Sequence, residues 1–400
     1  MRWPDSLPGE RGPGGGALRC AQAALMLLAI GLPISIAVTE IALVSGLVAL
    51  AVSRLRGRKF RSADGRLLWA SLALAAAWTL SSVLGENPLP ALHHVGKLYA
   101  MGLILLAAEA GADQRVRRRV VALIVASAVY MSMLGFLIYA VRAPLHPNDR
   151  LAAVFSNTMT SGGVLAAASL WALGAFLARR DARRLWFLLA MAPLAGALVL
   201  TQTRSHWLGA VAGAAVIVMS LAPRFWWALP ATLAIALPLL PHRLHRRLYG
   251  IIDPHEPGNQ GRISMWRSGR DIVRDHPVFG VGCQDLLSIY RRYRYPDWTF
   301  ESGHFHNNFV QMAVMTGLLG LSVFVFWLFS AARALMRALE AALPGADRGM
   351  AAAGIGIFTA LLVSGMFDYT FGDAEVVYHT YLAIGFALAI APGRRPALRP

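Results

Sequence analysis

Long apolar segments recur along nearly the whole 400-residue chain, and they constrain the fold more than any other feature. A helix that crosses a bilayer needs about 20 predominantly apolar residues. The composition agrees with repeated crossings, because 56% of the residues are hydrophobic and only 15% are charged, whereas soluble domains average about 45–50% and about 25%. The sequence therefore predicts an all-α integral membrane protein that forms a single polytopic domain over residues 1–400.

We predict about twelve transmembrane helices, several of them shorter than an ideal span. Their approximate ranges are 20–37, 38–53, 67–84, 97–111, 120–141, 159–178, 185–202, 206–222, 226–241, 308–330, 350–367 and 376–392. The first pair could be divided differently. One long loop, 242–307, separates the ninth and tenth spans, and its pattern predicts a helix over 262–276 followed by a turn at "PVFGVG".

The basic residues predict the orientation of the chain. There are 38 Lys and Arg against 21 Asp and Glu, a net charge of +17, and cytoplasmic segments of membrane proteins carry such an excess. An N-terminus inside the cell puts most basic segments on the cytoplasmic side, with both termini cytoplasmic and the 242–307 loop outside. A nucleic-acid-binding protein would gather its basic residues on one soluble surface, so no nucleic acid partner is expected.

Several basic residues nevertheless fall on the side where the orientation predicts few. Arg150 precedes the sixth span, Arg204 follows the seventh, and Arg262 opens the predicted loop helix. Each alone is consistent with a side chain that reaches toward lipid head groups. Together with Lys97, Arg270 and Arg274 they form an excess of positive charge that an anionic ligand would explain, because Arg pairs with phosphate oxygens and keeps its charge.

The pair His306 and Asn307 lies at the outer end of the tenth span, in "GHFHNNFVQ". One interpretation is structural, because Asn is a favourable helix N-cap. The other is chemical, because Gln311 lies one turn further inside the span and polar groups in spans usually face a cavity or a partner. A neutral His can accept a proton near neutral pH.

The remaining polar groups give weaker indications of a functional site. No Asp-x-Asp motif stands on the outer side and no His or Cys cluster has metal-ligand spacing, so neither a metal nor a cofactor is expected. We interpret the acids of "FDYTFGDAE" as a solvated loop and His304 as the weaker of the two neighbouring histidines. His93, His94 and His206 are interpreted as interfacial residues.

The order of three motifs resembles the O-antigen ligase and polymerase superfamily of bacterial envelope glycosyltransferases. The motifs are "TQTRSHWLG", "GRISMWRSGRDIVRDHPVFGVG" and "HNNFVQMAVMTGLLG". The residues that match the family pattern are Arg204; Arg262, Trp266, Pro277, Gly280 and Gly282; and His306, Asn307, Gly317 and Gly320. No single motif is specific, but their order and placement are, and the layout of spans extends the resemblance over the whole chain.

The resemblance implies a glycosyltransferase with the architecture of the membrane-embedded C-type enzymes and one large periplasmic loop. It implies a multi-pass protein of the bacterial inner membrane whose active site faces the periplasm. The implied donor is a polysaccharide on undecaprenyl diphosphate, and the implied acceptor is a sugar hydroxyl of lipid A–core, so that ligation completes lipopolysaccharide. Members of the ligase branch look metal-independent, which fits the missing acidic motif.

The same resemblance suggests roles for individual residues. The diphosphate leaving group develops charge that fixed cations would stabilise, which assigns Arg204 and Arg262, and then Arg150, Arg270 and Lys97, to the diphosphate. His306 becomes the general base for the acceptor hydroxyl, with Asn307 orienting the base or the acceptor, and a single displacement would invert the anomeric centre.

Other functions fit parts of this pattern. An O-antigen polymerase or a protein O-oligosaccharyltransferase would use the same chemistry on another acceptor; the compact chain and the short segment 142–158 favour the ligase. A transporter of anionic lipid or solute would also suit twelve spans, but transporters usually show two related halves and no clear internal repeat is present. A non-catalytic assembly partner for envelope polymers is the remaining alternative.

Overall fold

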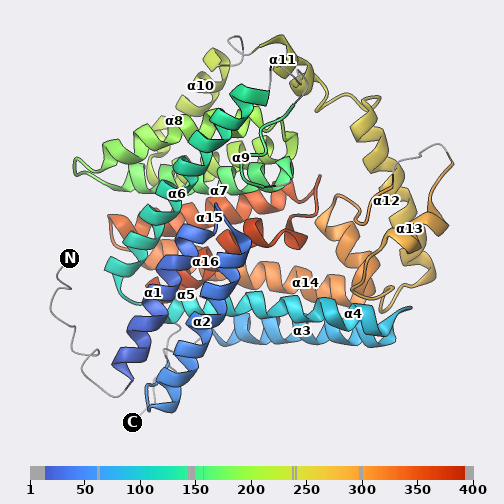
Figure 1. Cartoon of the computed structure of the whole chain (residues 1–400), viewed down its shortest axis with the longest axis horizontal. Helices are drawn as coiled ribbons and strands as arrows, with labels where there is room; N and C mark the ends of the chain where they lie inside the picture. The colour runs from blue at the N-terminus through green and yellow to red at the C-terminus, as the bar shows by residue number, and fades with distance from the viewer. Residues whose placement is uncertain are drawn as a thin grey trace.

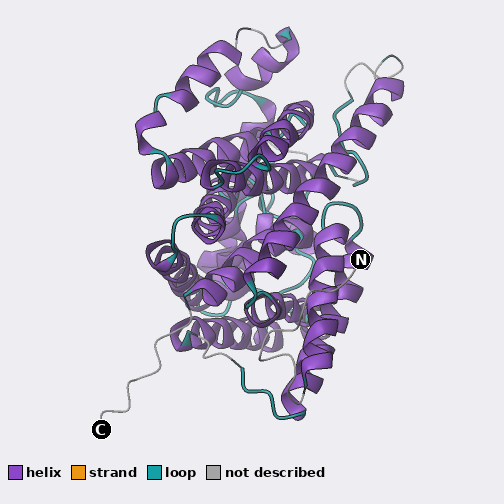
Figure 2. Ribbon diagram, turned by 90° about the vertical axis from the view of Figure 1, so that its left-hand side faces the viewer, coloured by secondary structure: helices purple, strands orange, loops and turns teal. Residues whose placement is uncertain are grey.

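The computed structural model describes most of the chain, and within that part every regular element is helical (Figure 2). The described residues are 14–60, 64–142, 144, 149–155, 157–236, 238, 241–296 and 301–391. The first half contains α1 (Gly15–Gly31), α2 (Ile36–Leu55), α3 (Gly65–Leu84), α4 (Pro88–Val95), η1 (Gly96–Met101), α5 (Gly102–Ala110), α6 (Gln114–Arg142), α7 (Thr158–Ala178) and α8 (Arg184–Leu200). The second half contains α9 (Arg204–Leu221), η2 (Pro223–Phe225), α10 (Ala228–Ala236), α11 (His242–Tyr249), α12 (Pro257–Asp275), α13 (Leu287–Tyr293), α14 (Asn308–Ala341), α15 (Ala346–Ser364), η4 (Thr370–Gly372) and α16 (Ala374–Ile390).

Seven of the described helices are long and apolar enough to cross a membrane, namely α2, α3, α6, α7, α9, α14 and α15. Four shorter apolar helices accompany them, at Gly15–Gly31, Leu98–Ala110, Arg184–Leu200 and Ala374–Ile390. Each of these eleven helices overlaps one of the predicted spans. The ninth predicted span, 226–241, coincides with α10, which has only 9 residues, and part of that span lies outside the described residues. The count of twelve therefore stays a prediction.

Side chains buried between the long helices hold the bundle together. The helix α9 packs along α15, α3 packs along α14, and α16 packs against α5. Trp171, Trp327 and Phe386 are among the largest side chains that are fully buried. Several outward-facing apolar side chains remain exposed, including Ile41 and Leu189, as expected for helices whose outer faces meet lipid.

The N-termini of α7, α9 and α14 lie at the same end of the bundle, which we call the site end. A hydrogen bond from Thr160 in the first turn of α7 to Asp373, before α16, joins these segments there, and Asn308 at the start of α14 bonds the Gly365 carbonyl after α15. In Figure 1 this end lies toward α12 and α13. The opposite end carries the connection from α7 to α8.

The segment between α10 and α14 contributes α11, α12 and α13 beside the site end. A second hydrophobic core, which includes Met265, Ile272 and Tyr290, joins α12 and α13 to the first turns of α14. The helix predicted over 262–276 is present but begins earlier, because Glu256 caps it through the amide of Asn259 and Pro257 occupies the first helical position, which suits proline.

The turn predicted at "PVFGVG" is wedged into a break in α14. Gly317 has a left-handed φ of 65° inside the helix, which frees carbonyls and amides of that turn. Val281 donates its amide to the Val314 carbonyl at 2.9 Å, and Leu318 donates to the Pro277 carbonyl at 2.8 Å. A Cβ at Gly317 would lie 2.2 Å from the Val278 carbonyl oxygen. The glycine therefore allows two backbones to pack directly, and this contact fixes the loop against the membrane bundle.

Candidate active site

His306 and Asp368 form the centre of the site. The Nδ1 atom of His306 lies 3.2 Å from Oδ1 of Asp368, and both side chains are largely buried. His306 comes just before α14 and Asp368 lies in the connection between α15 and η4, so a long-range contact joins them. His306 has a left-handed φ of 47°, a conformation uncommon outside glycine and often found at functional sites.

Two asparagines fasten the segment that carries Asp368. Asn307 caps α14, because its side-chain oxygen accepts the amides of Phe309 and Val310, and its Nδ2 donates to the Met366 carbonyl at 2.9 Å. The Asn308 side chain donates to Thr370 Oγ1 at 2.9 Å. The contacts of Asn307 are therefore those of a helix N-cap. Its side chain holds the backbone that leads to Asp368 and makes no hydrogen bond to the His306 ring.

Two further histidines surround the carboxylate. The His206 Nε2 atom lies 3.8 Å from Asp368 Oδ2, and the ring of His304 lies edge-on to that of His306 with centroids 4.1 Å apart. Burial by itself would raise the pKa of Asp368, but the hydrogen bond to His306 and the nearby histidines outweigh it and lower this pKa to about 2. Burial lowers the pKa of His304 to about 4, with the His306 charge acting in the same direction. Asp368 is therefore an anion and His304 is neutral at physiological pH.

The same group has the composition of a possible metal site. One ligand atom each from His304, His306 and Asp368 lies within 4.8 Å of the others, and Nδ1 of His304 has no hydrogen-bond partner among the described residues. Two histidines and a carboxylate match catalytic zinc sites. The spacing in the sequence did not reveal this group, because Asp368 comes from a distant segment.

A group of arginines lies beside this centre. Arg262 donates Nε to the Phe367 carbonyl at 2.9 Å, directly next to Asp368 in the chain, and Arg150 donates Nε to the Thr201 carbonyl at 2.8 Å. Burial lowers the pKa of Arg150 to about 10, and the charges of Arg247, Arg204 and Arg262 lower it further. Burial and the Arg204 charge likewise lower the pKa of Arg262. These guanidinium groups repel one another, so the structure gathers positive charge that a bound anion would stabilise.

Arg204 is held by acceptors from the 242–307 segment. Its Nη1 donates to the Gly250 carbonyl at 2.5 Å and its Nη2 pairs with Glu256 at 2.8 Å. Burial would raise the pKa of Glu256, but the hydrogen bond and charge of Arg204 lower it. Glu256 and Asp368 are the two acids whose charges raise the pKa of Arg262. Two carboxylates do not balance the four arginines gathered here.

One of the cations predicted from the sequence, Arg270, does not join this group. Arg270 is 72% exposed at its side chain and pairs with its neighbour Asp271 at 3.0 Å. Arg270 lies two turns along α12 from Arg262, so its side chain cannot share the same position. Lys97 belongs to η1, but its side chain lies outside the described residues.

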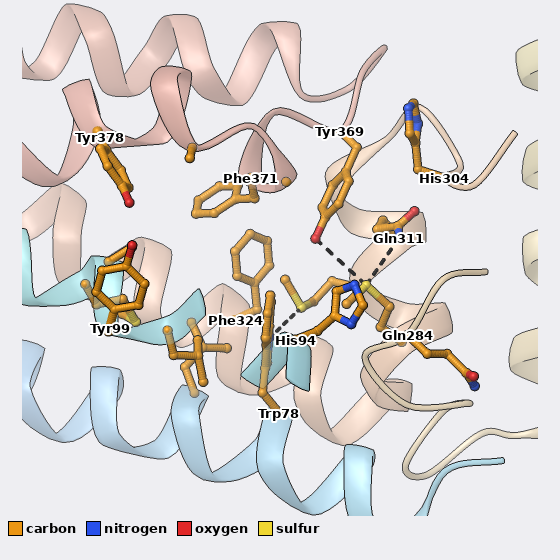
Figure 3. Close-up of a pocket in the computed structure, with 18 of the residues that line it drawn as sticks. Trp78, His94, Tyr99, Gln284, His304, Gln311, Phe324, Tyr369, Phe371 and Tyr378 are labelled. Carbon is orange, nitrogen blue, oxygen red and sulfur yellow. Dashed lines mark hydrogen bonds between the residues drawn. The ribbon is translucent and has the colours of Figure 1, made fainter. Parts of the chain in front are cut away.

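An aromatic cavity of about 490 Å³ adjoins the histidines. Figure 3 shows His304 at one end of it and Tyr99 and Tyr378 facing each other at the other end. Between them, Trp78 donates Nε1 to the Met312 sulfur at 3.3 Å. The lining is mostly apolar, so this cavity suits a hydrocarbon chain or the apolar face of a sugar better than a free charge.

The interpretation of the "FDYTFGDAE" acids as a solvated loop was wrong. Asp368 is only 7% exposed, and Asp373 is half-buried beside Thr160, whose hydroxyl donates to Asp373 Oδ2 at 2.6 Å. His206, interpreted as interfacial, is only 3% exposed. Asn308 and Arg247 were not singled out. An acid placed directly before a last apolar segment was the available signal for Asp368, since polar groups at membrane depth are costly unless they have partners.

Comparisons with known proteins concern the same part of the chain. Residues 189–325 match the family described as O-Antigen ligase. No curated protein matches significantly. A solved structure described as "Structural coordination of polymerization and crosslinking by a peptidoglycan synthase complex" is similar at 18% identity and a TM-score of 0.46, over 82% of this chain and 97% of that chain, a likeness too distant to carry an argument. The matched segment includes Arg204, Arg262, His306 and the first part of α14, so this third of the chain is similar to the O-antigen ligase family, within a chain whose described helices include seven long and apolar enough to cross a membrane.

Proposed function

We propose that this protein is an O-antigen ligase that transfers a polysaccharide from undecaprenyl diphosphate to a sugar hydroxyl of lipid A–core. The observation that carries the proposal is the hydrogen-bonded His306–Asp368 pair beside a group of half-buried arginines. A base and an excess of fixed positive charge are the two things that transfer from a lipid diphosphate requires. The family match supports the class of reaction.

His306 is the general base in this proposal. Asp368 accepts a hydrogen bond from the Nδ1–H group of His306. This leaves Nε2 of the neutral ring free to take the acceptor's hydroxyl proton. A buried carboxylate in this position also stabilises the imidazolium that forms. The freed oxygen attacks the anomeric carbon, and the bond from that carbon to the diphosphate oxygen breaks in the same displacement, which inverts the anomeric centre.

The arginines hold the departing diphosphate. Arg262 and Arg150 lie next to Arg204 and Arg247, so the leaving group would meet several cations whose positions are already fixed. Such preorganised charges stabilise the developing anion without reorganisation of the site. Arg204 must share its guanidinium between the diphosphate and Glu256, so Arg262 and Arg150 carry the main interaction. Arg270 and Lys97 remain proposals that no contact of the described residues supports.

The proposed setting follows from the basic segments. The donor and acceptor reach the site from the periplasmic face of the bacterial inner membrane, the 242–307 segment is a periplasmic insertion into the single membrane domain, and both termini are cytoplasmic. An O-antigen polymerase or a protein O-oligosaccharyltransferase uses the same groups on a different acceptor, so the acceptor distinguishes these activities.

Product formation by the purified protein tests this proposal. We expect ligated product when lipid-linked glycan and lipid A–core are supplied together, without ATP and in the presence of a chelator. Longer lipid-linked glycan without lipid A–core would identify a polymerase, and glycosylated pilin would identify a protein transferase. Loss of transfer in chelator, restored by zinc, would contradict the metal-independent base mechanism and assign His304, His306 and Asp368 to a metal.

A further inference from the structure

A second group of arginines lines a groove at the end of the bundle opposite the site end. The groove has a volume of about 480 Å³, and the basic residues on it are Arg118, Arg119, Arg179 and Arg183. The first two belong to the start of α6, and the others belong to the connection from α7 to α8. Because α7 begins at the site end and crosses the bundle, this connection lies at the far end, as Figure 1 shows on the left.

The floor of this groove is apolar. Leu123 follows the arginines one turn along α6, and Trp186 and Phe187 contribute from the first turn of α8. The two aromatic rings pack edge to face with centroids 4.7 Å apart, and the Arg179 guanidinium lies over the Phe187 ring at 5.8 Å. A cationic rim above an apolar floor matches an amphiphile, and a partly exposed tryptophan is typical of the membrane–water interface.

The positive charge of the groove is only partly balanced by Asp181, which interacts electrostatically with Arg118 and Arg183 as well as with Arg179. Arg179 pairs with Asp181 at 2.7 Å, and within the described residues no acid forms a salt bridge with Arg118, Arg119 or Arg183. The adjacent Arg117 differs, because it turns inward to Asp347 at 2.7 Å and is only 4% exposed at its side chain. On α6, Arg117 therefore has a structural role, whereas Arg118 and Arg119 face the groove.

We propose that this groove binds the phosphate of an anionic phospholipid, with an acyl chain against Leu123 and Phe187. Guanidinium groups pair with phosphate oxygens in two-point contacts, and basic pockets between transmembrane helices bind acidic lipid head groups. A general excess of basic residues on one membrane face would account for arginines here, but not for their convergence on one apolar-floored cavity. Inorganic phosphate would leave that floor unoccupied.

Neighbouring arginines provide a matched control. Arg180 lies in the same connection and Arg184 opens α8; both are exposed, but they do not line the groove. The double variant Arg118→Gln/Arg183→Gln therefore removes two groove charges, and Arg180→Gln/Arg184→Gln removes the same charge beside it.

Native mass spectrometry of the full-length protein tests the proposal, with phosphatidylglycerol, phosphatidylcholine or inorganic phosphate as the probe. We expect the wild type to retain phosphatidylglycerol in preference to phosphatidylcholine. The groove variant should lose that preference by about tenfold or more, since each basic residue contributes about 1 kcal/mol near an anionic surface. The control variant should keep it. The single exposed substitution Arg183→Glu should reproduce the loss if the double variant proves unstable.

Three results would overturn the proposal. Equal losses in the groove and control variants would assign the effect to general surface charge. An unchanged preference in all variants would show that the groove arginines hold no lipid. Displacement of phosphatidylglycerol by equimolar inorganic phosphate would make the groove a site for free anions.

Discussion

At the scale of single residues, Asp368 is the group on which the site depends. It is the partner of His306 at 3.2 Å and of His206 at 3.8 Å, and it stays ionised although it is buried. A buried carboxylate persists as an anion only where hydrogen bonds and positive potentials outweigh the loss of hydration. The same anion would fix the tautomer of His306, so its charge has a direct chemical consequence.

Replacing Asp368 by asparagine should lower the rate of transfer by about 10²-fold or more while changing the apparent KM for donor little. The shape of the side chain is kept, but the charge that orients and stabilises the imidazolium is lost. Steady-state kinetics of the purified variant would measure this. Asp373→Asn is the matched control, because Asp373 is a half-buried acid of the same segment that bonds Thr160 instead of a histidine, and it should retain most of the activity.

The pH dependence of stability provides a second readout for the Asp368 variant. The folded-state pKa of about 2 lies below the ordinary value of about 3.9. Because the pKa of Asp368 is lowered in the folded state, its ionised form stabilises the fold at pH values above the ordinary pKa. That stabilisation disappears as the pH falls toward 2. The unfolding midpoints of wild type and Asp368→Asn should therefore differ at neutral pH and converge in acid. A constant difference across this range would contradict the charged state of Asp368.

At the scale of elements, the break in α14 connects the loop segment to the bundle. The "PVFGVG" turn bonds to α14 on both sides of Gly317, and Gly280 has a left-handed φ of 67° where a Cβ would lie 2.4 Å from the Val314 carbonyl oxygen. These contacts hold α12 close to the start of α14. Because α12 carries Arg262 and α14 starts next to His306, the break sets the position of the cations relative to the base.

Gly317→Ala should destabilise the protein by more than about 2 kcal/mol, because a left-handed alanine is strained and its Cβ would meet backbone. The thermal unfolding midpoint in detergent would report this. Gly345→Ala, with a φ of 121° but nothing within 4 Å of the added Cβ, isolates the cost of the backbone conformation. Equal midpoints for the two variants would show that the packed loop adds no stability.

The sequence predicted the elements better than it predicted the site. Eleven of the twelve predicted spans fall on long or shorter apolar helices, because repeated apolar runs are a local signal. The His306–Asp368 contact is separated by 62 positions, and no local pattern reports which loops meet at a helix end. Arg270 was predicted to bind the diphosphate together with Arg262, yet its side chain is largely exposed.

At the scale of the whole molecule, the two ends of the bundle carry two separate basic groups. The site end gathers Arg150 and Arg262 beside an aspartate–histidine pair, and the opposite end carries the groove that includes Arg118 and Arg183. In the proposed orientation, the positive-inside rule favours the second location and disfavours the first. A basic group retained against this rule is a stronger indication of an anionic ligand than one that follows it.

Reporter fusions should confirm this arrangement in the membrane. Alkaline phosphatase, which is active only outside the cytoplasm, should be active when fused after residue 253 and inactive when fused after residue 181. A fluorescent protein that folds only in the cytoplasm should show the reverse. Activity of both fusions on the same side would contradict the proposed orientation and the periplasmic placement of His306.

The most direct test of the central claim is transfer by purified protein in chelator, compared between wild type, His306→Ala and His304→Ala. The account predicts that His306→Ala lowers ligation of glycan to lipid A–core by about 10²–10⁴-fold, the usual contribution of a general base, in protein that stays folded in detergent. His304→Ala should retain substantial activity, because His304 does not take the acceptor's proton. Near-normal ligation by folded His306→Ala protein would contradict the account.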